Sequence, residues 1–171
     1  MGISVFPAPS AASKTRYVET LTSGSSWTVP TGVTYVNVTL TGGGGGGGGT
    51  GDTATVGGAG GTTTFTGATS ATGGYGGASG DRDTPNTGAS GPANSGSGAD
   101  GAHGFEGSGS VLDAHHGGFG AIISSNVSTT PGNTISYGIG AGGTAGTGSG
   151  GGGAAAGGTG GSGKIEIEYW K

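Results

Sequence analysis

The chain has no cysteine, little charge and no long apolar run, and each absence excludes a class of protein. Without cysteine there are no disulfide frameworks and no thiolate metal sites. The 5 Lys and Arg against 9 Asp and Glu give a net charge of −4, which is unsuited to non-specific binding of nucleic-acid phosphates. No apolar run approaches the roughly 20 residues of a membrane-spanning helix. The first residues lack the basic start and apolar stretch of a secretory signal. We therefore expect no nucleic-acid partner, no membrane insertion and no cofactor.

Large side chains are also scarce, because glycine takes their place. Glycine accounts for 49 of the 171 residues, against an average usage of about 7%. The large apolar and aromatic residues gather in 1–40, in 111–139 and after Lys164, with few in between. A disordered chain would combine low hydrophobicity with high net charge, and here the charge is low. The clustering favours ordered segments separated by glycine tracts.

Where large side chains do occur, they alternate with polar residues. Val36, Val38 and Leu40 alternate with Asn37 and Thr39, which is the pattern of a half-buried β-strand. Other segments share this alternation or a run of β-branched residues: Trp27 to Val29, Thr62 to Thr66, Ile135 to Ile139 and Ile165 to Tyr169. No segment has convincing helical spacing. An antiparallel sheet with its first and last strong strands side by side would bury these residues economically. We therefore predict an all-β fold, an antiparallel, jelly-roll-like β-sandwich.

Two turn motifs support this prediction. In Thr130-Pro131-Gly132-Asn133, proline is second and glycine third, as a type II turn requires. In Val29-Pro30-Thr31-Gly32, proline is second and glycine fourth, which predicts a type I turn. Each motif adjoins an expected strand.

The glycine tracts allow three interpretations. Residues 42–49 are all glycine, and 140–163 are almost entirely glycine, alanine, threonine and serine. Flexible linkers are the simplest interpretation, but they would place long loose tracts inside one fold. A collagen helix is disfavoured because the Gly-X-Y phase in 98–107 is short and lacks proline. We favour extended threefold polyglycine II helices, packed side by side and joined by backbone hydrogen bonds.

Reactive side chains are few and lie in the glycine-rich middle of the chain. The histidines and the acids nearest to them are His103, His115, His116, Asp100, Glu106 and Asp113. No nucleophile elbow accompanies them, so we expect no catalysis. A metal ion held by these residues is a weaker hypothesis than solvated loop side chains, because adjacent histidines point to opposite sides of an extended chain. A polysaccharide depolymerase would need two carboxylates about 5–10 Å apart, which the sequence does not establish.

Binding is the stronger hypothesis for residues 75–119. This segment concentrates the aromatic, charged and amide side chains that the rest of the chain lacks. Aromatic rings stack on sugar rings while polar groups bond to hydroxyls, and loops on a rigid scaffold commonly carry such residues. The residues that we select for recognition are Tyr75, Asp81, Arg82, Asp83, His103, Phe105, Asp113, His115 and His116. The glycosylation patterns at Asn37 and Asn126 are interpreted as chance matches.

Three stretches resemble the glycine-rich domains of tailed-bacteriophage tail fibres. The first is SWTVPTGV at 26–33 with VNVTL at 36–40, running into polyglycine. The second is TPGNTISY at 130–137 followed by IGAGG at 139–143, and the third is GGSGKIEIEY at 160–169. Together they cover roughly 23–66 and 119–170, in the family's order.

This resemblance implies a non-catalytic virion protein, a tail fibre or fibre-tip adhesin on the exposed surface of a phage particle. It would bind a bacterial surface glycan or outer-membrane protein. Residues 67–118 would be the recognition insertion of a glycine-rich β domain, 23–171. Residues 1–22 would be an attachment arm to other virion proteins, with Val5, Phe6 and Pro7 as contacts. The chain would form a homo-oligomer, with a trimer favoured. The alternative is a capsid or tail decoration, or a head fibre, with a purely structural role.

Overall fold

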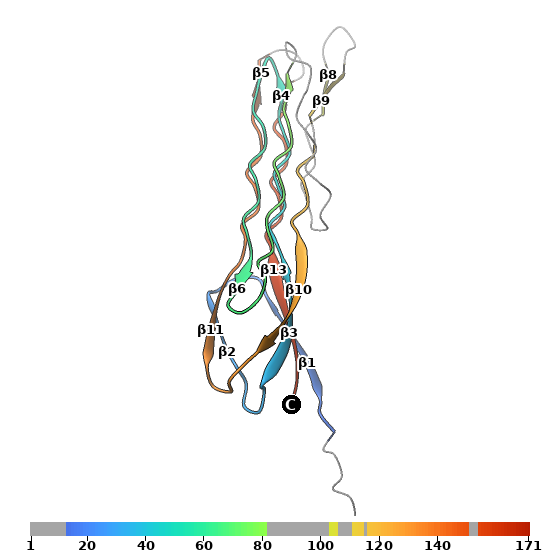
Figure 1. Ribbon diagram of the computed structural model, residues 1–171. Coiled ribbons are helices and arrows are strands. Elements are labelled where there is room, and N and C mark those ends of the chain that lie inside the picture. The colour runs from blue at the N-terminus through green and yellow to red at the C-terminus, as the bar shows by residue number, and fades with distance from the viewer. Residues whose placement is uncertain (1–12, 82–102, 106–110, 115, 151–153) are drawn as a thin grey trace, which may run out of the picture.

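The computed structural model describes residues 13–81, 103–105, 111–114, 116–150 and 154–171. These residues form 13 β-strands and no helix. Accordingly, no helix in the described part of the chain is long and apolar enough to cross a membrane. A β-sheet module holds the apolar core, and a long bundle of glycine tracts extends from it (Figure 1).

The larger sheet has four antiparallel strands in the order β1-β13-β3-β10. Their bounds are Arg16–Leu21 for β1, Tyr35–Thr41 for β3, Ile122–Ser128 for β10 and Lys164–Trp170 for β13. On β3, Leu40 is paired with Ile123 on one side and with Ile165 on the other. The first and last strong strands of the sequence are therefore neighbours, as predicted.

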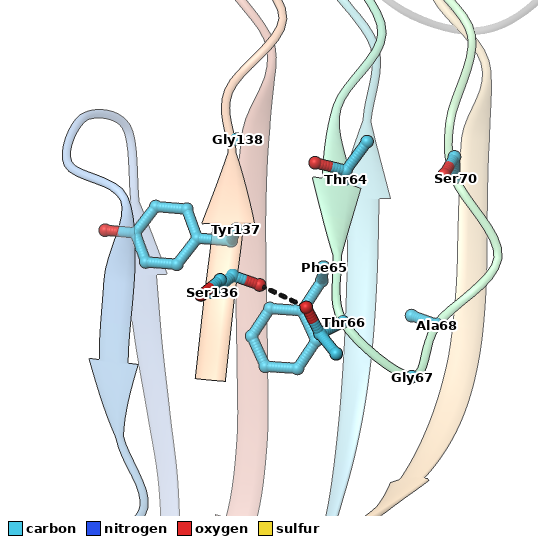
Figure 2. A pocket seen from close by; sticks show the side chains of 9 residues that line it. All are labelled: Thr64, Phe65, Thr66, Gly67, Ala68, Ser70, Ser136, Tyr137 and Gly138. Carbon is cyan, nitrogen blue, oxygen red and sulfur yellow. Dashed lines mark hydrogen bonds between the residues drawn. The ribbon is translucent and has the colours of Figure 1, made fainter. Parts of the chain in front are cut away.

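The smaller sheet has three strands in the order β2-β11-β6. Their bounds are Ser26–Thr28 for β2, Thr134–Gly138 for β11 and Thr64–Phe65 for β6. Both pairings are antiparallel. Figure 2 shows β11 beside β6, with the Thr66 hydroxyl donating to the Ser136 carbonyl at 3.0 Å.

One of the two predicted turns is confirmed and the other is displaced. The Asn133 N–H donates to the Thr130 carbonyl at 3.1 Å and Gly132 has a φ of 82°, as a type II turn requires. The turn at Pro30 is closed by the Val33 N–H donating to the Pro30 carbonyl, with Gly32 at a φ of 83°. The prediction of a type I turn at 29–32 was therefore wrong by one residue, because the positive φ makes glycine the third residue of a type II turn.

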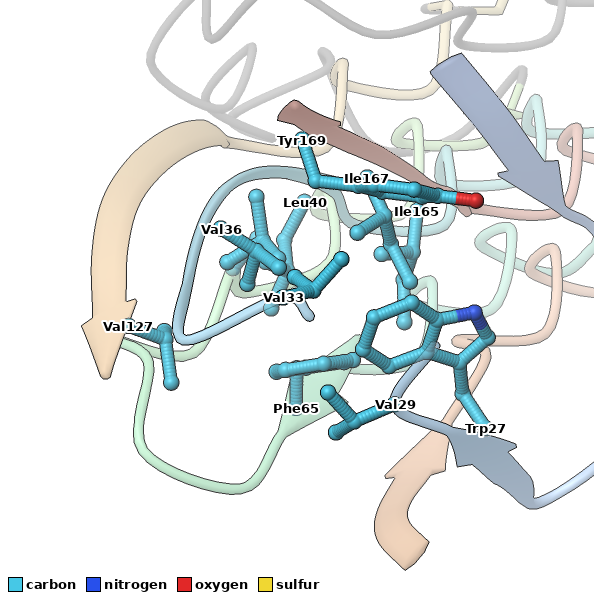
Figure 3. Close-up of a cluster of buried hydrophobic side chains, with 12 residues drawn as sticks. Trp27, Val29, Val33, Val36, Leu40, Phe65, Val127, Ile165, Ile167 and Tyr169 are labelled. Carbon is cyan, nitrogen blue, oxygen red and sulfur yellow. The ribbon is translucent and has the colours of Figure 1, made fainter. Parts of the chain in front are cut away.

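The inner faces of the two sheets enclose one apolar core (Figure 3). Its members are Trp27, Val29, Val33, Val36, Val38, Leu40, Phe65, Ala71, Val127, Ile165, Ile167 and Tyr169. The ring of Trp27 lies 6.3 Å from that of Phe65 and 6.0 Å from that of Tyr169, centroid to centroid. The prediction of an all-β, sandwich-like fold with antiparallel sheets is confirmed.

A shared carboxylate fixes β1 to the core. Glu19 accepts a hydrogen bond from the Trp27 indole at 2.9 Å and another from the Tyr169 hydroxyl at 2.5 Å. Burial and the hydrogen bond to Glu19 raise the pKa of Tyr169 to about 12, because ionising this hydroxyl would place a second negative charge beside the Glu19 carboxylate. The Tyr17 ring also stacks on Tyr169, at 5.4 Å. Residues 16–21, which fall inside the expected arm 1–22, are thus part of the sheet.

The glycine bundle consists of a central tract, 42–49, surrounded by other extended tracts. Successive amides of the central tract donate to different neighbours. Each bond joins an N–H to a carbonyl oxygen at 2.8–2.9 Å, with the donor first: Gly43 and Gly61, Gly44 and Gly161, Gly45 and Gly118, Gly46 and Gly58, and Gly47 and Gly158. Two further tracts donate to it, from Gly74 to Gly43 and from Gly143 to Gly44, both at 2.8 Å. Because the partner repeats every third residue, these tracts are packed polyglycine II helices rather than loose linkers.

Glycine is required inside this bundle because backbone surrounds it. A Cβ at Gly45 would lie 1.9 Å from the Tyr75 carbonyl oxygen, and one at Gly46 would lie 1.9 Å from that of Thr144. In 56–62, two glycines alternate with one larger residue that is exposed, namely Val56, Ala59 and Thr62. In 72–78 the same period exposes Thr72 and Tyr75, whereas Ala78 is buried. Apart from Ala78, the period of three in these two tracts marks the side that faces solvent.

Candidate recognition surface

Short strands complete the end of the bundle that is farthest from the core. They are β4 (Thr50–Gly51), β5 (Thr53–Ala54), β7 (Gly80–Asp81), β8 (His103–Phe105), β9 (Val111–Asp113) and β12 (Gly148–Ser149). They pair as β4 with β7, β5 with β12, and β8 with β9. In Figure 1 the labels β4, β5, β8 and β9 lie at the top, while β1 lies at the opposite end. We call this the distal end.

The distal end brings together several residues that were predicted to act in recognition. His103 is opposite Asp113 in the β8–β9 ladder, and Phe105 is opposite Val111. Asp81 is paired with Gly51 of β4, and β4 contacts both strands of the β8–β9 hairpin. Residues distant in sequence thus share one end of the molecule.

Other selected residues lie elsewhere. Tyr75 lies on the side of the bundle, about 19 Å from the level of Asp81 at 3.1 Å per residue, and it is 61% exposed. His116 is exposed at the beginning of the tract that ends in β10. Arg82, Asp83, His115 and the predicted arm contacts Val5, Phe6 and Pro7 lie outside the described residues, and their roles stay predictions.

A groove on the side of the bundle combines Tyr75 with an aromatic residue that we did not select. Phe119 is 45% exposed and lies on the tract beside that of Tyr75, where the Gly118 N–H donates to the Tyr75 carbonyl at 2.6 Å. The groove has a volume of about 300 Å³ and is lined by Ala59, Gly60, Thr62, Thr72, Gly73, Gly74, Tyr75 and Phe119. The period of three could have identified Phe119, because it places Phe119 on the solvent side.

The outer face of the larger sheet is a second polar surface that the sequence analysis missed. Asn37 of β3 is opposite Glu168 of β13 on one side and Asn126 of β10 on the other. Tyr35, two residues before Asn37 at the start of β3, has an exposed ring. These residues are isolated in the sequence, because only the strand order brings β3, β10 and β13 together. The two glycosylation-like asparagines are therefore cross-strand partners.

Neither this surface nor the hollow in Figure 2 has the arrangement of a metal centre. The hollow, about 410 Å³ between β6 and β11, is lined by Thr, Ser, Gly and Ala together with Phe65 and Tyr137. The Tyr137 hydroxyl donates to the Ser23 carbonyl at 2.8 Å. Across the part of the chain that the structure describes, no three or more His, Asp or Glu side chains gather as a metal site would require.

Comparisons with known proteins returned no relative. No family model matches the chain, and neither a curated protein nor a solved structure matches it.

Proposed function

We propose that this chain is a non-catalytic bacteriophage virion protein, a tail fibre or fibre-tip adhesin that binds a bacterial surface receptor. The observation that carries the proposal is the position of the β8–β9 hairpin and Asp81 at the distal end, opposite β1 (Figure 1). The attachment arm, expected as 1–22, would contact other virion proteins through the residues that precede β1, since Arg16–Leu21 belongs to the larger sheet. The distal end would then face the host.

The glycine bundle suits the role of a spacer between attachment and recognition. The central tract of 42–49 spans about 25 Å at 3.1 Å per residue. Its backbone hydrogen bonds to the surrounding tracts give it lateral support that a glycine linker lacks. A packed spacer keeps distal residues at a fixed distance from the sheet module, so less conformational freedom is lost on binding.

The residues of the distal end suit a polar receptor. His103, Phe105 and Asp113 combine an aromatic ring with groups that donate and accept hydrogen bonds. Such combinations recognise sugars and polar protein loops. Assembly as a homo-oligomer, with a trimer favoured, would present several copies and raise avidity.

Competition for phage adsorption tests this proposal. Purified protein is added to host cells before the phage that carries the chain. The intact protein is expected to block adsorption. A variant with 82–113 replaced by a Gly-Ser linker is expected to need at least about tenfold more protein for half-maximal block, which corresponds to about 1.4 kcal/mol of binding free energy. The linker joins Asp81 to Ala114, since Gly117 and Gly120 pack against the central tract and must stay.

The control is Thr159→Ala, at an exposed position on another tract of the bundle, which is expected to block as the intact protein does. Circular dichroism verifies that each variant is folded. If the intact protein fails to block, receptor binding is contradicted and the purely structural decoration becomes the better hypothesis. If the linker variant blocks equally well, recognition does not depend on 82–113.

A further inference from the structure

Among the described residues of the glycine bundle, the exposed large side chains lie on one side. Val56, Tyr75 and Phe119 are 63%, 61% and 45% exposed, and they lie on the three neighbouring tracts 56–62, 72–78 and 116–121. The solvent-facing residues of 141–147 and 159–162 are alanine, threonine and serine. All these tracts pack around the same central tract, so packing does not explain why large residues occur on one side alone.

The two aromatic residues are held at fixed positions by backbone hydrogen bonds. Two hydrogen bonds join the tract of Phe119 to that of Tyr75. The Gly118 N–H donates to the Tyr75 carbonyl at 2.6 Å, and the Ala121 N–H donates to the Thr72 carbonyl at 2.8 Å. The tract of Tyr75 is bonded in turn to 57–62 by the Gly60 N–H donating to the Gly74 carbonyl at 2.8 Å. The groove is therefore formed before any ligand arrives, which lowers the entropic cost of binding.

The lining of the groove defines the chemistry of its ligand. It contains two aromatic rings, the hydroxyls of Thr62, Thr72 and Tyr75, and no acidic, basic or imidazole side chain. Its volume of about 300 Å³ is at the lower end of small-ligand sites. Uncharged walls with rings and hydroxyls fit a ligand that has apolar C–H faces and many hydroxyl groups but no net charge.

We propose that this groove binds a neutral saccharide segment of a bacterial surface polysaccharide, with sugar rings against Tyr75 and Phe119 and hydroxyls bonded to Thr62 and Thr72. This inference rests on the proposed function for the source of the polysaccharide. It assigns a second contact on the side of the bundle, in addition to the distal end. The groove gives one short segment of a glycan a place against the side of the bundle.

Binding of host oligosaccharides tests the inference. The probe is the neutral fraction of oligosaccharides released from host surface polysaccharide, titrated calorimetrically into the full chain. Tyr75→Ala and Phe119→Ala are each expected to weaken binding about tenfold, because each removes one of the two rings that line the groove. Tyr75→Phe keeps the ring and is expected to retain most of the affinity. Val56→Ala is the matched control, because Val56 is exposed on the same side but does not line the groove.

Three results would overturn the inference. The first is no binding by the intact chain, and the second is binding by both alanine variants that is as tight as binding by the intact chain. The third is self-association in sedimentation that Phe119→Ala abolishes. The last result would make the groove a contact between copies of the chain. This test can fail while the intact protein still blocks phage adsorption. It can also succeed when adsorption is not blocked, so the two proposals are distinguishable.

Discussion

Replacing Gly46 with alanine is expected to destabilise the protein by about 3 kcal/mol or more, the upper end of the usual cost of overpacking. The added Cβ would lie 1.9 Å from the Thr144 carbonyl oxygen and 2.6 Å from its carbonyl carbon. Both atoms belong to backbone whose own hydrogen bond, from the Gly58 N–H to that oxygen at 2.7 Å, would have to move. No flexible side chain is available to absorb the added volume, so the tracts must separate.

The loss should appear as a fall in melting temperature of about 6–12 °C, since 1 kcal/mol corresponds to about 2–4 °C in a chain of this size. Ala141→Ser is the control, because it also adds one heavy atom to a tract of the bundle but at an exposed position. Equal melting temperatures for the two variants would show that the central tract is not enclosed as described.

Replacing Ile167 with alanine is expected to cost about 2–5 kcal/mol, as truncation of a fully buried aliphatic side chain does. Ile167 is completely buried on β13, which lies between β1 and β3. Its neighbours in the core come from both sheets, so a cavity at this position cannot be filled by rearranging one strand. The midpoint of urea unfolding, with the slope checked for constancy, measures the loss.

Glu166→Gln is the matched control for this prediction. Glu166 precedes Ile167 on β13 but is partly exposed, and it forms an ion pair with Lys164 at 3.4 Å. Surface pairs of this kind contribute about 0–1 kcal/mol, so the midpoint should hardly change. A shift for Ile167→Ala no larger than that of the control would contradict the position of the core.

The sheet module was largely predictable because side chains determine it. Strands with period-two alternation at 36–40 and 165–169 must bury one face, and they became β3 and β13. The turn after Val29 was predicted one residue too early, since Pro30 and Gly32 are two positions apart and match a type I turn that begins at Val29. The difference depends on the φ of Gly32, which only the fold determines.

The bundle was predictable in kind but not in arrangement. Polyglycine II packing was favoured for 42–49, yet the partner of each glycine carries no sequence signal because the contacts are between backbone atoms. The same reason concealed the groove. Tyr75 was selected for its composition alone, whereas its pairing with Phe119 becomes evident only when 72–78 and 116–121 are bonded side by side.

The enclosure of 42–49 underlies both the proposed spacer and the groove, and hydrogen exchange tests it most directly. The N–H groups of Gly43, Gly44, Gly46 and Gly47 donate to neighbouring tracts at 2.8–2.9 Å. Peptides that cover 42–49 are therefore expected to exchange as slowly as those of the core strand β3, because both require opening of packed backbone. Exchange of 42–49 at the rate of an unstructured glycine peptide, with β3 protected, would contradict the account.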